Sequence, residues 1–149
     1  MVNTYTNLFV HVVFSVKERR PLLNKELRNE LFPYIIGIAK AKNFQIPIIN
    51  GVDDHVHILM LLKPDLSVSQ AVQFIKGGSS KWIHGRFNDL KIFTWQEGYG
   101  AFSVSTSQID RVKKYILNQS IHHQKIDFKQ EYRKLLEINN IEFTEKYLF

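Results

Sequence analysis

The run Asp53-Asp54-His55-Val56-His57-Ile58-Leu59-Met60-Leu61-Leu62 decides how this chain folds. Its second half is continuously apolar, as a buried strand requires. Side chains alternate between the two faces of a strand, so His55 and His57 point to the same face. Two imidazoles on one face can offer two nitrogen ligands to one metal ion. The spacing alone fits two ordinary strand histidines equally well, so the rest of the chain must decide.

The segments around this run predict a hairpin and an earlier strand. Residues 44–51 and 55–62 have the composition of two strands, and the residues between them, Gly51-Val52-Asp53-Asp54, have that of a turn. Residues 5–16 are rich in aromatic and β-branched side chains and predict a first strand. The chain is therefore expected to contain a first strand and, later, a β-hairpin.

Two helices are predicted next to these strands by their capping residues. Asn24 can cap a helix that extends to about residue 42. Ser67-Val68-Ser69-Gln70 has the form of a capping box, and it predicts a helix that extends to about residue 85.

The C-terminal half continues with extended and then helical segments. Residues 92–95 and 99–105 are expected to be extended, with a break at Gly98. Ser107 is expected to cap a third helix over 108–123, and a shorter helix should follow near 129–138.

The β-α-β-β-α-β order followed by C-terminal helices predicts an α+β fold of the ferredoxin-like, split βαβ type. We expect an antiparallel sheet with helices on one face, the other face being free for a ligand or partner, and a single domain over residues 1–149.

Composition excludes several classes of protein. The 149 residues include no cysteine, which excludes disulfide scaffolds and thiolate metal sites. No run approaches the roughly 18 to 20 apolar residues of a membrane span, and the N-terminus does not resemble a signal peptide, so a cytoplasmic protein is expected. The net charge of +6 favours polyanionic partners without specifying one.

The third predicted helix carries polar residues next to its apolar stripe. Ile109, Val112 and Ile116 form that stripe, and Tyr115 and Gln119, four residues apart, lie along one edge of it. Such residues are also common at the boundary of a core. If they belong to a site, a metal held by two imidazoles and an amide oxygen would polarise a phosphoryl group, and a tyrosine could attack phosphorus.

Several further segments make the chain similar to a known family. It resembles the small single-tyrosine HUH transposases of the insertion-sequence-200 type, and the similarity extends over essentially the whole chain. The segments that carry it are the first strand with Lys17-Glu18-Arg19-Arg20-Pro21, then residues 53–59, 75–82, 95–105, 115–123 and the closing 141–149.

The resemblance implies an enzyme that cuts and rejoins single-stranded DNA. It implies that His55 and His57 are metal ligands, that Gln119 is the third protein ligand, and that Tyr115 is the nucleophile. It further implies Mg²⁺ or Mn²⁺ as cofactor, DNA hairpins near the ends of a mobile element as substrate, and a 5′-phosphotyrosine intermediate. The family also implies a homodimer in which the histidine pair of one subunit works with the tyrosine helix of the other.

Two physical expectations accompany these roles. Because Mg²⁺ prefers oxygen ligands and imidazole suits Mn²⁺ better, we expect metal binding to be weak until DNA contributes phosphate oxygens. Basic side chains are candidates for phosphate contacts, namely Lys17, Arg19, Arg20, Lys76 and Arg111.

Two other functions are compatible with the same residues. One is a metal-dependent nuclease that activates water, with Tyr115 merely packing. The other is a ferredoxin-like module that binds single-stranded nucleic acid on its sheet without cutting it.

Overall fold

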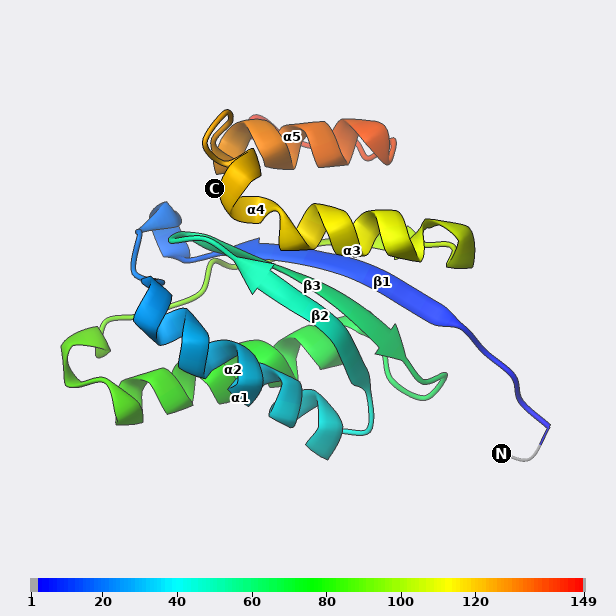
Figure 1. The fold of residues 1–149 in the computed structure, drawn as a ribbon, viewed down its shortest axis with the longest axis horizontal. Coiled ribbons are helices and arrows are strands. Elements are labelled where there is room, and N and C mark those ends of the chain that lie inside the picture. Colours follow the sequence, from blue (N-terminus) through cyan, green and yellow to red (C-terminus); the bar gives the residue numbers. More distant parts are fainter. Residues whose placement is uncertain (1–2, 149) are drawn as a thin grey trace.

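The computed structural model of the chain describes residues 3–148, so Met1, Val2 and Phe149 lie outside the described part. Within it, four strands form one antiparallel sheet in the order β2-β3-β1-β4. They are β1 (Leu8–Ser15), β2 (Gln45–Gly51), β3 (His55–Leu62) and β4 (Gly100–Val104). The α+β architecture with an antiparallel sheet, predicted from sequence, is confirmed (Figure 1).

Two long helices cover one face of the sheet. They are α1 (Lys25–Ala41) and α2 (Val68–Arg86). The predicted caps are present: the Asn24 side chain accepts a hydrogen bond from the amide of Leu27, and Ser67 forms a capping box with Gln70. Alternate residues of the strands pack against these helices and form the larger core, which includes Val12, Phe14, Val56, Ile58, Met60, Leu27, Leu31, Ile35 and Ile75.

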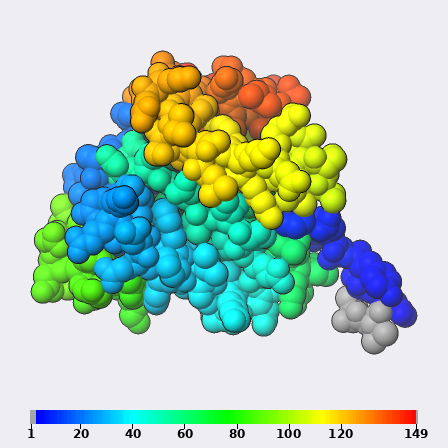
Figure 2. Space-filling view, viewed as in Figure 1, coloured from blue at the N-terminus to red at the C-terminus, as the bar shows by residue number. Residues whose placement is uncertain are grey.

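The opposite face of the sheet is covered as well, contrary to the expectation of a free face. Three further helices lie over it: α3 (Ile109–Leu117), α4 (Gln119–His122) and α5 (Phe128–Ile138). In the space-filling view, the yellow-to-red C-terminal segment forms a continuous layer on that side (Figure 2). A second, smaller core of Val13, Phe102, Phe128, Tyr132, Leu136 and Leu148 holds this layer to the sheet. The sequence did not predict that the C-terminal helices cover this face. The apolar stripe of an amphipathic helix shows that the helix docks, but not on which surface.

The predicted third helix is interrupted. It ends at Leu117, and Asn118, with φ −93° and ψ 21°, separates α3 from the short α4. Ser107 does not cap it, because a 3-10 turn at Thr106–Gln108 precedes Ile109. Asparagine is a poor residue for a helix interior, and the Asn50 side chain donates hydrogen bonds to the carbonyls of Ile116 and Leu117 at 2.9 and 3.1 Å. This contact holds the end of α3 against β2.

The remaining segments are short turns and bridges. Besides Thr106–Gln108, the structure has 3-10 turns at Lys17–Arg19, Asn88–Leu90 and Glu145–Tyr147. The expected strand over 92–95 is reduced to one bridge, between Trp95 and Val16, and the break at Gly98 is confirmed by its φ of +78°. Across residues 3–148, no helix combines the length and apolar character needed to span a membrane.

Candidate active site

The two histidines of β3 lie at the centre of the covered face. His57 is directly opposite Val13 of β1 and Asn50 of β2, and His55 is opposite Ser15. Both side chains are completely buried. The alternation of the strand therefore places both imidazoles under the C-terminal layer, on the side away from α1 and α2, as the spacing predicted.

Each of these rings is held by a second residue at its Nδ1 atom. The Nδ1 of His55 lies 2.7 Å from Oδ1 of Asp54, which can only accept its proton. The Nδ1 of His57 lies 2.8 Å from Nε2 of the buried His11. Such partners orient a metal-binding histidine, so that its Nε2 faces the position of the ion. His11 is therefore part of the site, as the partner that orients His57.

The protonation of these rings follows from their surroundings. Burial lowers the pKa of His11 to about 3 and that of His57 to about 4, so both rings are neutral at neutral pH. Burial also acts to lower the pKa of His55, but its hydrogen bonds with Asp54 and Glu131 outweigh that effect and raise it. A neutral imidazole is the form that binds a metal ion.

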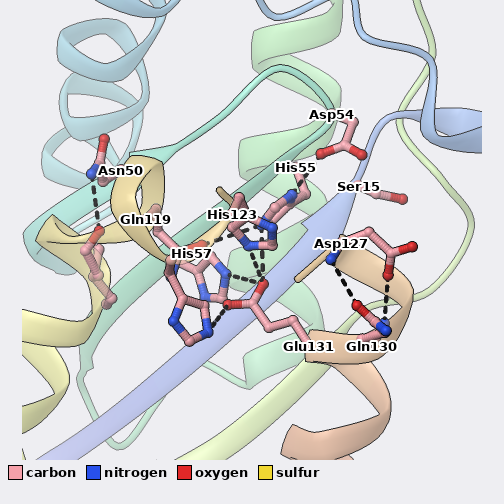
Figure 3. Close-up of polar contacts among 12 residues, drawn as sticks. Ser15, Asn50, Asp54, His55, His57, Gln119, His123, Asp127, Gln130 and Glu131 are labelled. Atoms are coloured by element: carbon pink, nitrogen blue, oxygen red, sulfur yellow. Dashed lines mark hydrogen bonds and ion pairs between the residues drawn. The ribbon is translucent and has the colours of Figure 1, made fainter. Parts of the chain in front are cut away.

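Two C-terminal residues complete a cluster with the histidine pair. Oε1 of Glu131 lies 3.1 Å from Nε2 of His55, 3.0 Å from Nε2 of His57 and 2.9 Å from Nε2 of His123. One ligand atom from each of the four residues lies within 4.8 Å of the others. Figure 3 shows the three rings and the carboxylate pointing toward one another. Three nitrogens and one oxygen form a donor set that fits a divalent transition-metal ion.

The position of Glu131 is set by the packing of α5. Asp127 forms a capping box with Gln130 and starts the helix, so that Glu131 lies on the same face as the buried Phe128 and Tyr132. Burial by itself would raise the pKa of the Glu131 carboxyl, but hydrogen bonds from His123, His55 and His57 hold it well below its usual range. The carboxylate is therefore charged although only 1% of its surface is exposed.

Tyr115 reaches the same cluster from α3. Its ring centre lies 5.6 Å from that of His57 and 6.0 Å from that of His11. Its hydroxyl donates a hydrogen bond to Oε2 of Glu131. Burial and the negative charge of Glu131 both raise the pKa of Tyr115, so the phenol is protonated in this arrangement.

Gln119 links the tyrosine backbone to the histidine pair. Its side chain is completely buried, its Nε2 donates to the carbonyl of Tyr115 at 3.3 Å, and its Oε1 lies 3.3 Å from Nε2 of His55. The structure thus brings together the four residues singled out in the sequence, His55, His57, Tyr115 and Gln119, within one chain. The interruption at Asn118 does not separate Tyr115 from Gln119.

The basic residues expected to contact DNA are not among the residues that form this cluster. Lys17 and Arg19 form a 3-10 turn after β1, where Arg20 pairs with Glu18 at 3.3 Å. Lys76 is on α2, on the other side of the sheet, and its ammonium donates to the carbonyls of Gln96 and Gly98. Burial lowers the pKa of Lys76 to about 8. Arg111 is exposed on α3, the helix that carries Tyr115.

Sequence reasoning assigned no role in the site to His123 or Glu131. One signal was available for Glu131. Phe128, Glu131, Tyr132 and Leu136 follow helical spacing, and a carboxylate on such an apolar stripe needs a partner. Two of its partners, His55 and His57, lie on a strand more than seventy residues away and could not be read from that pattern.

Comparison with known proteins identifies the family. The family model described as "Transposase IS200 like" matches residues 4–119. The chain belongs to the IS200-like transposase family. Its residues 55, 57, 115 and 119 all fall within the matched segment, whereas His123 and Glu131 lie beyond it.

Relatives within the IS200-like family agree with this assignment. The transposase for insertion sequence element IS200 of Salmonella typhimurium is 29% identical over 124 residues, which are 80% of this chain and 81% of that protein. The ISDra2 transposase TnpA of Deinococcus radiodurans is 25% identical over 114 residues, 73% of this chain and 81% of that protein.

Two solved structures show the same fold as this IS200-like chain. A putative transposase from Deinococcus radiodurans has a TM-score of 0.66 at 24% identity, over 78% of this chain and 94% of that one. A REP-associated tyrosine transposase bound to a REP hairpin has a TM-score of 0.62 at 20% identity, over 83% of this chain and 73% of that one.

Proposed function

We propose that this IS200-like protein is a DNA transposase that cuts and rejoins single-stranded DNA at element ends through a 5′-phosphotyrosine intermediate. The observation that supports this most directly is the convergence of Tyr115 with His55 and His57 on the covered face of the sheet. Binding of nucleic acid alone would require neither a buried histidine pair nor a tyrosine directed at it.

In the cleavage step, the Tyr115 oxygen forms a bond to phosphorus and the bond between phosphorus and the 3′-oxygen breaks. The phenolic proton passes to solvent, and the departing 3′-oxygen takes up a proton to become a 3′-hydroxyl. Rejoining is the reverse reaction, in which a 3′-hydroxyl attacks the phosphotyrosine and restores the phenol. The phosphodiester energy is kept in the tyrosine ester, so no nucleotide triphosphate is consumed.

In this proposal, His55, His57 and Gln119 would hold the metal ion, which is Mg²⁺ or Mn²⁺. When bound, the ion polarises the phosphoryl oxygens and stabilises charge on the leaving oxygen. Asp54 and His11 support this role by orienting the two rings at their Nδ1 atoms. Imidazole ligands favour Mn²⁺ over Mg²⁺.

The proposed substrate is a single-stranded DNA hairpin, in keeping with the structural relative that is bound to a REP hairpin. The net charge of +6 favours DNA over neutral partners, and we propose phosphate contacts for Lys17, Arg19, Arg20, Lys76 and Arg111. We also propose that the chain forms a single domain. The protein is proposed to act as a homodimer in the cytoplasm. Sharing of sites between subunits is not needed to bring Tyr115 to His57, since both come from one chain.

The test uses a labelled single-stranded hairpin from the flanks of the protein's own gene, with Mn²⁺ or Mg²⁺. We expect a covalent protein–DNA adduct that is absent with Tyr115→Phe and with a chelator. Cleavage that persists with Tyr115→Phe would instead identify a nuclease that activates water. Binding without any cleavage would identify a passive nucleic-acid module.

A further inference from the structure

Glu131 is a buried carboxylate for which the proposed reaction has so far no role. It comes from α5, beyond the part of the chain that the family model matches. A charged carboxylate that is 1% exposed is costly unless it is fully paired. Its two oxygens have different partners, and those partners are the metal-binding and the nucleophilic halves of the proposed site.

The first oxygen, Oε1, lies at distances from the imidazole nitrogens that suit hydrogen bonds and also suit neighbouring ligands of one ion. Its distances to the three imidazole nitrogens, 3.1, 3.0 and 2.9 Å, are similar. Ligand atoms bonded to one ion at about 2.1 Å are separated from their neighbours by roughly 3.0 to 3.4 Å, depending on the geometry. The set of three imidazoles and one carboxylate is also one that Mn²⁺ and Zn²⁺ accept more readily than Mg²⁺.

The second oxygen, Oε2, accepts the hydrogen bond from the Tyr115 hydroxyl. His122, whose ring centre is 5.1 Å from that of Tyr115, lies with its Nε2 3.8 Å from the same oxygen. The Glu131 carboxylate therefore contacts the phenolic oxygen through one of its oxygens and the three imidazoles through the other.

A hollow of about 420 Å³ beside the cluster offers a route for a cation. Its lining includes His123 and three carboxylates, those of Asp53, Asp54 and Asp127, with Arg28 as the one basic side chain among its lining residues. A wall in which negative charge dominates attracts a metal ion and repels a phosphate. The ion and the DNA are therefore expected to reach the site from different sides.

We propose that Glu131 is a bridging residue that completes a metal centre with His55, His57 and His123 of the same chain while it positions the Tyr115 hydroxyl beside that centre. The proposal rests on the function proposed above and adds two ligands from the C-terminal layer to it. Because these four side chains and Gln119 then supply the ligands, the protein binds Mn²⁺ before DNA arrives. This replaces the expectation of weak binding in the absence of DNA.

The metal half is tested by titrating the DNA-free protein with Mn²⁺ and following the free ion by electron paramagnetic resonance. Glu131→Gln keeps the shape of the side chain and is expected to weaken Mn²⁺ binding at least about tenfold, as is His123→Asn. Glu137→Gln, on the exposed side of the same helix, is the matched control and should leave the affinity unchanged. An unchanged affinity in both Glu131→Gln and His123→Asn, with loss of binding in His57→Ala, would overturn the proposed ligand set.

The positioning half is tested by single-turnover adduct formation at saturating Mn²⁺. We expect Glu131→Gln to reduce the rate of adduct formation with little change in DNA affinity, and Glu131→Asp to restore part of the rate. A wild-type rate in Glu131→Gln would refute positioning while leaving the transposase function intact. If the wild-type protein formed no adduct, the proposed function would fail, whereas the Mn²⁺ titration would still decide whether Glu131 is a ligand. Circular dichroism spectra establish that each variant is folded.

Discussion

Substituting alanine for Gly100 is expected to push α5 away from the sheet. Gly100 of β4 lies opposite Val13 of β1, and the ring of Tyr132 lies against it. A Cβ atom at Gly100 would come within 2.8 Å of Cε1 of Tyr132 and within 3.0 Å of Cζ of Phe102. Carbon atoms in favourable contact are about 3.5 to 4.0 Å apart, so the Tyr132 ring must retreat by roughly 1 Å.

The expected cost follows from this overlap. Overpacking of a core costs about 1 to 3 kcal/mol, and in a domain of this size each kcal/mol lowers Tm by about 2 to 4 °C. We therefore expect Gly100→Ala to lower Tm by roughly 4 to 8 °C, for a cost near 2 kcal/mol. Because Glu131 is the neighbour of Tyr132 on α5, the same displacement should weaken Mn²⁺ binding.

Thermal unfolding followed by circular dichroism measures the first effect, and Mn²⁺ titration measures the second. Gly77→Ala is the matched control, because no atom lies within 4 Å of a Cβ at that position on α2. Alanine in place of glycine inside a helix stabilises by about 0.5 to 1 kcal/mol, so the control should melt slightly higher than the wild type. A Gly100→Ala protein that melts as high as the control would refute the close packing of Tyr132 on β4.

Three further predictions concern pH, ring orientation and capping. The folded-state pKa of His11, about 3, lies below its ordinary value of 6.5, so the unfolded chain binds the proton at a higher pH than the folded chain does. The contribution of His11 to stability is therefore complete above pH 6.5 and declines as the pH falls toward 3, and the decline of the urea midpoint over this range should be smaller in His11→Gln. Asp54→Asn should weaken Mn²⁺ binding by about 10- to 100-fold in a calorimetric titration, because Asp54 orients His55, whereas Asp65→Asn, exposed in the turn after β3, should have little effect. Ser67→Ala should cost about 1 kcal/mol in urea unfolding through loss of the capping box of α2, and an unchanged midpoint would contradict that role of Ser67.

Local patterns were sufficient for most of the sheet and for the two long helices. The alternation around His55 and His57 predicted a strand over residues 55–62, which is what β3 spans. Asn24 and Ser67 predicted the starts of α1 and α2, because a capping side chain and the amide it serves are only a few residues apart. The third helix was predicted less well, since its break at Asn118 depends on contacts with Asn50 of β2.

For the site, the sequence by itself determined which residues share one face of a strand or helix. The family resemblance then grouped His55, His57, Tyr115 and Gln119 as one proposed site. His55 and His57 follow from the strand period, and Tyr115 and Gln119 from spacing along a helix. The tertiary structure alone decided that the C-terminal layer closes over the sheet and brings Glu131 and His123 to these histidines. Strand and helix periods are short-range properties of the backbone, whereas the meeting of residues 57 and 131 depends on how the C-terminal layer buries Phe128 and Tyr132 against β1 and β4.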